Sequence, residues 1–122
     1  MVLLLIDDDP DEFEIFCDAV RAYDPRIDCR HAKSGDEAMA LLTDIKPDHI
    51  FLDVNMPVMS GADILAFIKS HPELKDISVH MYSTTQNPKE LAHFLKLGAS
   101  SFLEKPTYVS DFTNALKAIL RT

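Results

Sequence analysis

Four groups of side chains in this sequence could do chemistry together. Three consecutive carboxylates occupy positions 7–9 and another stands at Asp53, while Ser83 offers a hydroxyl and Lys105 an ammonium. Carboxylates that lie close together repel one another and need a cation to stay ionised together at neutral pH. Oxygen ligands of this kind suit a hard cation, so we expect Mg²⁺.

The same groups suit a phosphoryl group. Phosphoryl transfer needs mostly positioning and neutralisation of charge, which a metal ion, the ammonium of Lys105 and the hydroxyl of Ser83 can supply. An aspartate can serve as the nucleophile and form an acyl phosphate. Each residue alone has a plainer interpretation: positions 7–9 as a helix cap, Asp53 as a turn residue, Ser83 as a loop hydroxyl and Lys105 as a solvated lysine.

Short apolar runs and helical patterns alternate along the chain and must position these groups. The apolar runs predict strands at residues 2–6, 27–31, 49–52, 78–82 and 101–103. Apolar residues at helical spacing predict a helix after each strand. Four of these helices have a capping residue at the start, namely Asp9 followed by Pro10, Ser34 in a capping box with Glu37, Ser60, and Asn87 followed by Pro88. Gly98 is expected to end the fourth helix.

This alternation predicts an α/β fold with a parallel sheet and helices on both faces. The acidic run, Asp53, Ser83 and Lys105 each follow a predicted strand. The carboxyl ends of parallel strands meet at one edge, where ligands bind in such sheets. We therefore expect these side chains to converge.

Composition limits the other possibilities. The chain has 122 residues, 47% of them hydrophobic, so we expect one packed domain over residues 1–122. A net charge of −8 argues against nucleic acid or an anionic membrane as a partner. No signal peptide or membrane span is evident, which predicts a cytoplasmic protein, and Cys17 and Cys29 are expected to be reduced packing residues.

The sequence resembles the receiver domain of two-component response regulators, in the manner of a stand-alone chemotaxis regulator. The resemblance rests on Asp7-Asp8 after the first strand, on Leu-Asp-Val-Asn-Met-Pro-Val-Met-Ser-Gly around Asp53, on Ser83 and on Lys105-Pro106. These matches occur in order and cover essentially the whole chain. The resemblance implies a flavodoxin-like fold, a five-stranded parallel sheet of order 2-1-3-4-5.

The resemblance also implies roles at the metal site. Asp53 would be the phosphoacceptor, taking the phosphoryl group from the phosphohistidine of a sensor histidine kinase or a histidine phosphotransfer protein. Asp8 and Asp53 would be Mg²⁺ ligands, Asp7 would act mostly through water, and Asn55 would offer its backbone carbonyl.

Further roles fall on the switch residues. Lys105 would pair with the phosphoryl oxygens, Ser83 would be the switch hydroxyl, and Phe102 would be the rotating aromatic, although an aromatic in a strand is more often a core residue. The peptide bond between Lys105 and Pro106 would be cis. Thr84 departs from the family, which usually has Ala or Gly there, and we expect it to slow autodephosphorylation.

The resemblance implies a phosphorylation-controlled switch that is not an enzyme beyond its own phosphorylation and slow dephosphorylation. Because the chain ends just after the last predicted helix, we expect no output domain, and output either through an effector protein in trans or by onward phosphotransfer in a relay. We also expect a monomer or weak dimer. One alternative is a receiver whose site has decayed into a phosphorylation-independent interaction module. A haloacid-dehalogenase-type phosphatase is disfavoured because its nucleophile follows the first strand, and a flavin-binding protein is disfavoured by the acidic first loop.

Overall fold

The structure is a computed structural model that describes residues 1–54, 56, 58–83, 87–105 and 109–120, with only the backbone of residues 109–111. Strands and helices alternate as β1 (Val2–Ile6), α1 (Pro10–Tyr23), β2 (Asp28–Ala32), α2 (Gly35–Asp44), β3 (His49–Asp53), α3 (Gly61–Ser70), β4 (Ser78–Ser83), α4 (Pro88–Lys96), β5 (Ser101–Glu104) and α5 (Val109–Leu120). The predicted alternation is confirmed. β3, β4 and β5 each extend one residue beyond the predicted end, and β2 is shifted by one residue at both ends.

The strands form one five-stranded sheet in the order β2-β1-β3-β4-β5. Every neighbouring pair is parallel. The fold class and the strand order expected from the resemblance are therefore confirmed. The order reverses between β1 and β3, which makes the carboxyl ends of these two strands the expected ligand-binding position.

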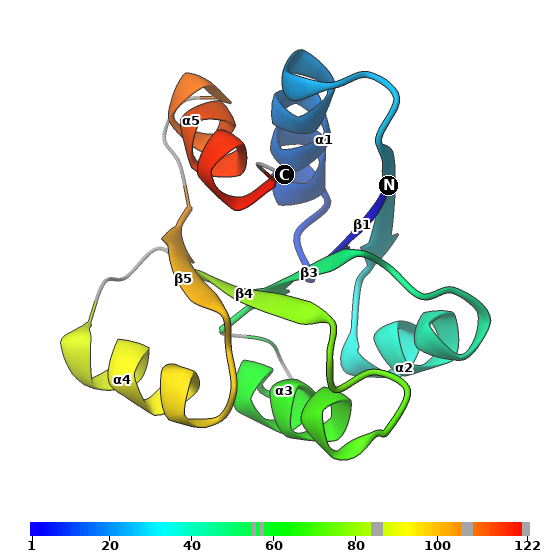
Figure 1. The fold of residues 1–122 in the computed structure, drawn as a ribbon, viewed down its shortest axis with the longest axis vertical. Helices are drawn as coiled ribbons and strands as arrows, with labels where there is room; N and C mark the ends of the chain where they lie inside the picture. The colour runs from blue at the N-terminus through cyan, green and yellow to red at the C-terminus, as the bar shows by residue number, and fades with distance from the viewer. Residues whose placement is uncertain (55, 57, 84–86, 106–108, 121–122) are drawn as a thin grey trace.

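The helices lie in two layers, with α1 and α5 on one face of the sheet and α2, α3 and α4 on the other (Figure 1). Each layer buries its own apolar cluster. Phe16, Phe51, Tyr82 and Phe112 are the large aromatics of the α1/α5 side. Leu4, Ile50 and Ile64 are fully buried on the other side. Burial on both faces explains why β1 and β3 read as continuous apolar runs.

Side-chain caps fix where the helices begin. Asp9 accepts from the backbone N–H of Asp11, and Asn87 accepts from that of Lys89, each at 2.9 Å. Ser34 Oγ accepts from the backbone N–H of Glu37 at 3.1 Å, which is half of the capping box predicted there. The complete reciprocal box forms at the start of α3 instead. Gly98 has φ +106° just after α4, as predicted for a helix end.

Within the described residues, no helix is long and apolar enough to cross a membrane. Cys17 and Cys29 are free thiols, and burial raises the pKa of Cys29 to about 12.

Candidate functional site

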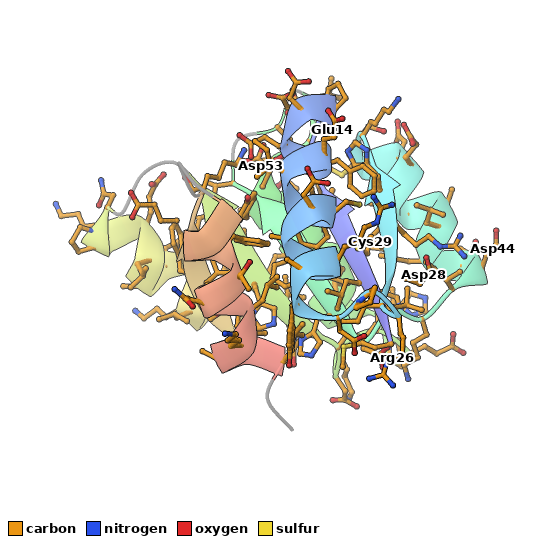
Figure 2. The ribbon with its side chains drawn as sticks, turned by 90° about the horizontal axis from the view of Figure 1, so that it is seen from above. Glu14, Arg26, Asp28, Cys29, Asp44 and Asp53 are labelled. Carbon is orange, nitrogen blue, oxygen red and sulfur yellow. The ribbon has the colours of Figure 1, made fainter. Side chains whose placement is uncertain are left out.

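The carboxyl ends of four strands bring the predicted residues to one end of the sheet. Asp7 follows β1 directly, Asp53 is the last residue of β3, Ser83 is the last residue of β4, and Lys105 follows β5 directly. In Figure 2, Asp53 lies at the same end of the sheet as the start of α1, while Arg26 lies toward the opposite end. The predicted convergence at this edge is confirmed for these four residues.

Asp7 is held through all of its polar groups. Its backbone N–H donates to the carbonyl of Ala32 at 3.0 Å, and its own carbonyl lies 2.8 Å from Nε2 of His31. Its Oδ1 accepts from the backbone N–H of Asp9 at 2.9 Å, and its Oδ2 lies 3.0 Å from Nζ of Lys105. The side chain is fully buried, so this carboxylate is fixed in place before any ligand binds.

Lys105 is an ammonium between two carboxylates. Its Nζ lies 3.0 Å from Asp7 Oδ2 and 3.4 Å from Asp53 Oδ1, and its side chain is 12% exposed. Its backbone N–H donates to the carbonyl of Ser83 at 2.7 Å, which fixes where the side chain starts. Burial opposes the charge, but the hydrogen bond to Asp7 and the charges of Asp7 and Asp53 outweigh it and raise the pKa of Lys105. The lysine is therefore a lasting positive charge in the site.

One ammonium does not balance the carboxylates gathered here. Carboxylate oxygens of Asp7, Asp8 and Asp53 lie within 4.8 Å of one another, with Asp8 exposed and the other two buried. Within the described part of the chain, the contact of Asp7 Oδ2 is its ion pair with Lys105, and no further hydrogen bond is present there. An all-oxygen donor set with excess negative charge fits Mg²⁺ or another hard divalent cation. The residues present therefore fit the metal that the sequence suggested.

The backbone around Asp53 is fixed by β4 and by the start of α3. The N–H of Val54 donates to the carbonyl of Tyr82 at 3.1 Å, and the N–H of Gly61 donates to the carbonyl of Val54 at 3.2 Å. A Cβ added at Gly61 would lie 2.7 Å from the carbonyl oxygen of Asp53. Glycine is therefore needed here for a close approach of two backbone segments.

Two predicted switch residues are described, with different environments. Ser83 is 1% exposed at the end of β4. Phe102 is partly buried, with its ring 6.3 Å from that of Phe94 on α4. Asn55, Thr84 and the peptide bond between Lys105 and Pro106 lie outside the described residues, so the roles predicted for them stay predictions.

Three residues that the sequence analysis did not select also belong to this site. Glu12 has a buried Oε2 with no hydrogen-bond partner among the described residues, and burial raises the pKa of this carboxyl although the charge of Lys105 lowers it. The ring of Tyr82 lies under Lys105, with 5.4 Å between Nζ and the ring centroid. His31 contacts the carbonyl of Asp7 and stacks on Phe13 at 4.4 Å. In sequence, Glu12 resembles a first-turn helix acid, and Tyr82 and His31 resemble ordinary strand residues, so no pattern marked them.

Comparison with known proteins agrees with this geometry. The family model described as "Response regulator receiver domain" matches residues 3–117. The chain belongs to this family. The transcriptional regulatory protein PrrA of Mycobacterium tuberculosis is 29% identical over 119 residues, which are 98% of this chain and 49% of PrrA. The receiver therefore spans about half the length of that relative.

Solved receiver structures have the same fold. The chemotaxis response regulator CheY4 of Vibrio cholerae aligns with a TM-score of 0.86 at 24% identity, over 97% of each chain. The Mn(2+)-bound form of the response regulator Rcp1 aligns with a TM-score of 0.83 at 26% identity, over 97% of the receiver and 90% of Rcp1. The flavodoxin-like, CheY-like receiver fold is therefore confirmed.

Proposed function

We propose that this receiver is a phosphoacceptor switch in a two-component phosphorelay, with Asp53 as the accepting residue. The observation that carries the proposal is the buried carboxylate of Asp53, 3.4 Å from the ammonium of Lys105 and close to the carboxylates of Asp7 and Asp8. Such an arrangement supplies a nucleophile, a cation for the phosphoryl oxygens and ligands for a metal ion.

The donor would be a phosphohistidine on a sensor histidine kinase or a histidine phosphotransfer protein. A carboxylate oxygen of Asp53 attacks the phosphorus, the P–N bond breaks, and the departing imidazole keeps the electron pair of that bond. The product is an acyl phosphate. Lys105 then pairs with the phosphoryl oxygens, and the hydroxyl of Ser83 donates a hydrogen bond to them.

The carboxylates of Asp7, Asp8 and Asp53, with the backbone carbonyl of Asn55, would hold Mg²⁺. Bound Mg²⁺ would neutralise the charge shared by these carboxylates and the incoming phosphoryl oxygens. Support comes from the oxygen-only donor set and from Rcp1, whose solved form contains Mn(2+). Within this set we place Asp7 in an indirect, water-mediated role, because its two oxygens already contact Asp9 and Lys105.

Phosphorylation would add about 1.5 to 2 negative charges at the end of the sheet. We propose that Ser83 and Thr84 move toward the phosphoryl group and that Phe102, which packs beside α4, changes position with them. The changed surface would bind an effector protein, with the receiver itself a monomer or weak dimer in the cytoplasm. The chain spans about half the length of PrrA. We therefore include in the proposal that residues 1–122 act on a separate effector protein.

The test is phosphorylation by acetyl phosphate with Mg²⁺, followed by intact-protein mass spectrometry. We expect wild type to gain the mass of one phosphoryl group and Asp53→Asn to gain none. Asp44→Asn, which removes an exposed carboxylate of α2 far from the site, should match wild type. Absence of the added mass in wild type, or its persistence in Asp53→Asn, would contradict the proposal. Because no turnover is expected, p-nitrophenyl phosphate should stay intact.

A further inference from the structure

Tyr82 is a fully buried tyrosine directly beneath the lysine of the site. It lies on β4 opposite Asp53 of β3 in the strand register, and its ring centroid is 5.4 Å from Nζ of Lys105. Phe112 of α5 contacts the ring edge-to-face, with 5.5 Å between centroids. The ring is therefore held between the sheet and α5 in a fixed position.

The phenol group does not explain why a tyrosine ring is buried here. Tyr82 Oη is buried and has no hydrogen-bond partner among the residues that the structure describes, although a buried hydroxyl normally finds one. Burial, followed by the charges of Glu12, Asp7 and Asp53, raises the pKa of the phenol, so it stays neutral. What the site uses is therefore the aromatic face.

An aromatic face attracts a cation within about 6 Å of its centroid, and more strongly where water is excluded. Lys105 meets both conditions, because its side chain is only 12% exposed. The ring differs from Asp7 and Asp53 in one important respect. It attracts the ammonium without accepting its N–H groups in hydrogen bonds, so these can be transferred to phosphoryl oxygens while the ring contact persists.

We propose that Tyr82 is a positioning residue whose ring holds the ammonium of Lys105 in place while its hydrogen bonds pass from the carboxylates to a phosphoryl group. The functional part of this inference rests on the proposed phosphorylation of Asp53. Because Phe112 fixes the ring, the same contact links α5 to the lysine. A displacement of Phe112 would therefore shift the ring of Tyr82 and, with it, the ammonium of Lys105 at the proposed phosphorylation site.

The contact itself can be tested without phosphorylation. A double-mutant cycle uses wild type, Tyr82→Leu, Lys105→Met and the double variant, with unfolding by urea as the measurement. The unfolding equilibrium constants should show a favourable coupling of about threefold to tenfold between ring and ammonium. A cycle with Tyr82→Phe in place of Tyr82→Leu should show no coupling, because Phe keeps the ring. Absence of coupling in the Leu cycle overturns the proposal.

The positioning role is tested by the rate of phosphorylation by acetyl phosphate and Mg²⁺, in which acetate leaves as the Asp53 acyl phosphate forms. Tyr82→Leu should lower the rate about threefold to tenfold, and Tyr82→Phe should restore it. Phe51→Leu is the matched control, because Phe51 belongs to the same buried aromatic cluster but lies on β3, where its ring contacts those of Phe16, His80 and Phe112. It should lower stability while leaving the rate near wild type.

The two measurements separate the possible failures. If wild type is not phosphorylated, the proposed function fails and the cycle alone decides whether the ring holds the lysine. If coupling is present but Tyr82→Leu is phosphorylated as fast as wild type, the positioning role is wrong. If Phe51→Leu slows phosphorylation as much as Tyr82→Leu does, the effect comes from lost packing, and the role assigned to Tyr82 is again wrong.

Discussion

Gly61 brings the first turn of α3 against the backbone of Asp53. An alanine here would place its Cβ 2.7 Å from the carbonyl oxygen of Asp53 and 3.0 Å from Cα of Val54, and neither backbone atom can move without moving Asp53, the proposed phosphoacceptor. We expect Gly61→Ala to lower the free energy of unfolding by about 1 to 3 kcal/mol and to slow phosphorylation of Asp53.

Gly35 provides the control for this substitution. It is also buried at the start of a helix, but its added Cβ would meet Sδ of Met59 at 2.6 Å, which belongs to a flexible side chain. Gly35→Ala should therefore cost less than Gly61→Ala in urea unfolding and leave the phosphorylation rate unchanged. Equal effects of the two substitutions would show that the approach to Asp53 has no special importance.

Val58, in the loop after Asp53, has an unfavourable backbone conformation. Its φ is +69°, and its side chain is fully exposed. A β-branched residue is strained in this region, and exposure means that no packing compensates. We expect Val58→Gly to raise the free energy of unfolding by about 1 kcal/mol in chemical denaturation, and Val58→Asn to raise it by less. A destabilised Val58→Gly variant would mean that the strain is absent in solution.

At the scale of elements, the alternation of strands and helices could be predicted because each buried strand is an apolar run and most helices begin with a cap. Strand ends were less predictable. Asp53 and Ser83 are the last residues of β3 and β4, whereas the sequence placed them just after. Backbone pairing continues past the apolar run, as with the N–H of Val54 bonding to Tyr82, and side-chain polarity carries no signal for it.

The candidate site was predictable to the extent that topology determines it. Strand ends bring Asp7, Asp53, Ser83 and Lys105 to one edge whatever the side-chain details. The contacts of Tyr82 with Lys105 and of His31 with Asp7 depend instead on the register of neighbouring strands and on side-chain direction. Neither is contained in the spacing of residues along one strand, so these contacts could be found only in the structure.

Polar side chains from three strands form a hydrogen-bonded row on the α1/α5 face of the sheet. Nδ1 of His49 on β3 lies 3.0 Å from Nε2 of His80 on β4, and Nδ1 of His80 lies 2.6 Å from Oγ of Ser101 on β5. Burial, and then the charge of His49, lowers the pKa of His80 from 6.5 to about 4. Burial also lowers the pKa of His49. Both imidazoles are therefore neutral near pH 7.

The row of His49, His80 and Ser101 predicts that the free energy of unfolding depends on pH. The unfolded chain protonates His80 near its ordinary pKa of 6.5, whereas the folded protein resists protonation down to about pH 4. The contribution to stability is therefore complete above pH 6.5 and is lost as pH falls toward 4, by roughly 3 kcal/mol in all. In urea unfolding between pH 7.5 and 4.5, the free energy of unfolding of wild type should fall relative to that of His80→Leu as pH falls. The difference in free energy of unfolding between wild type and His93→Leu, which changes an exposed histidine of α4, should vary much less with pH. If the free energies of unfolding of wild type and His80→Leu run parallel across this pH range, the prediction is wrong.

At the scale of the whole molecule, negative charge is both abundant and concentrated. The net charge is −8, and three carboxylates with oxygens within 4.8 Å of one another occupy one end of the sheet. Their repulsion opposes folding in the absence of a divalent cation, because unfolding separates them. A cation that binds only the folded protein reverses this effect by mass action. The stability of the receiver should therefore depend on Mg²⁺ more than on ionic strength.

Asp8 gives the sharpest test, because it is the exposed member of the carboxylate cluster and makes no ion pair with a described residue. Without Mg²⁺, Asp8→Asn should be more stable than wild type, since one repelling charge is gone. At Mg²⁺ about 100-fold above its dissociation constant, wild type should gain about 3 kcal/mol and Asp8→Asn much less, so the order reverses. Thermal unfolding with MgCl₂ against NaCl of equal ionic strength measures this. Asp44→Asn, which removes the same charge from α2, should show no reversal, and a reversal there would mean that Mg²⁺ acts through general screening instead of this site.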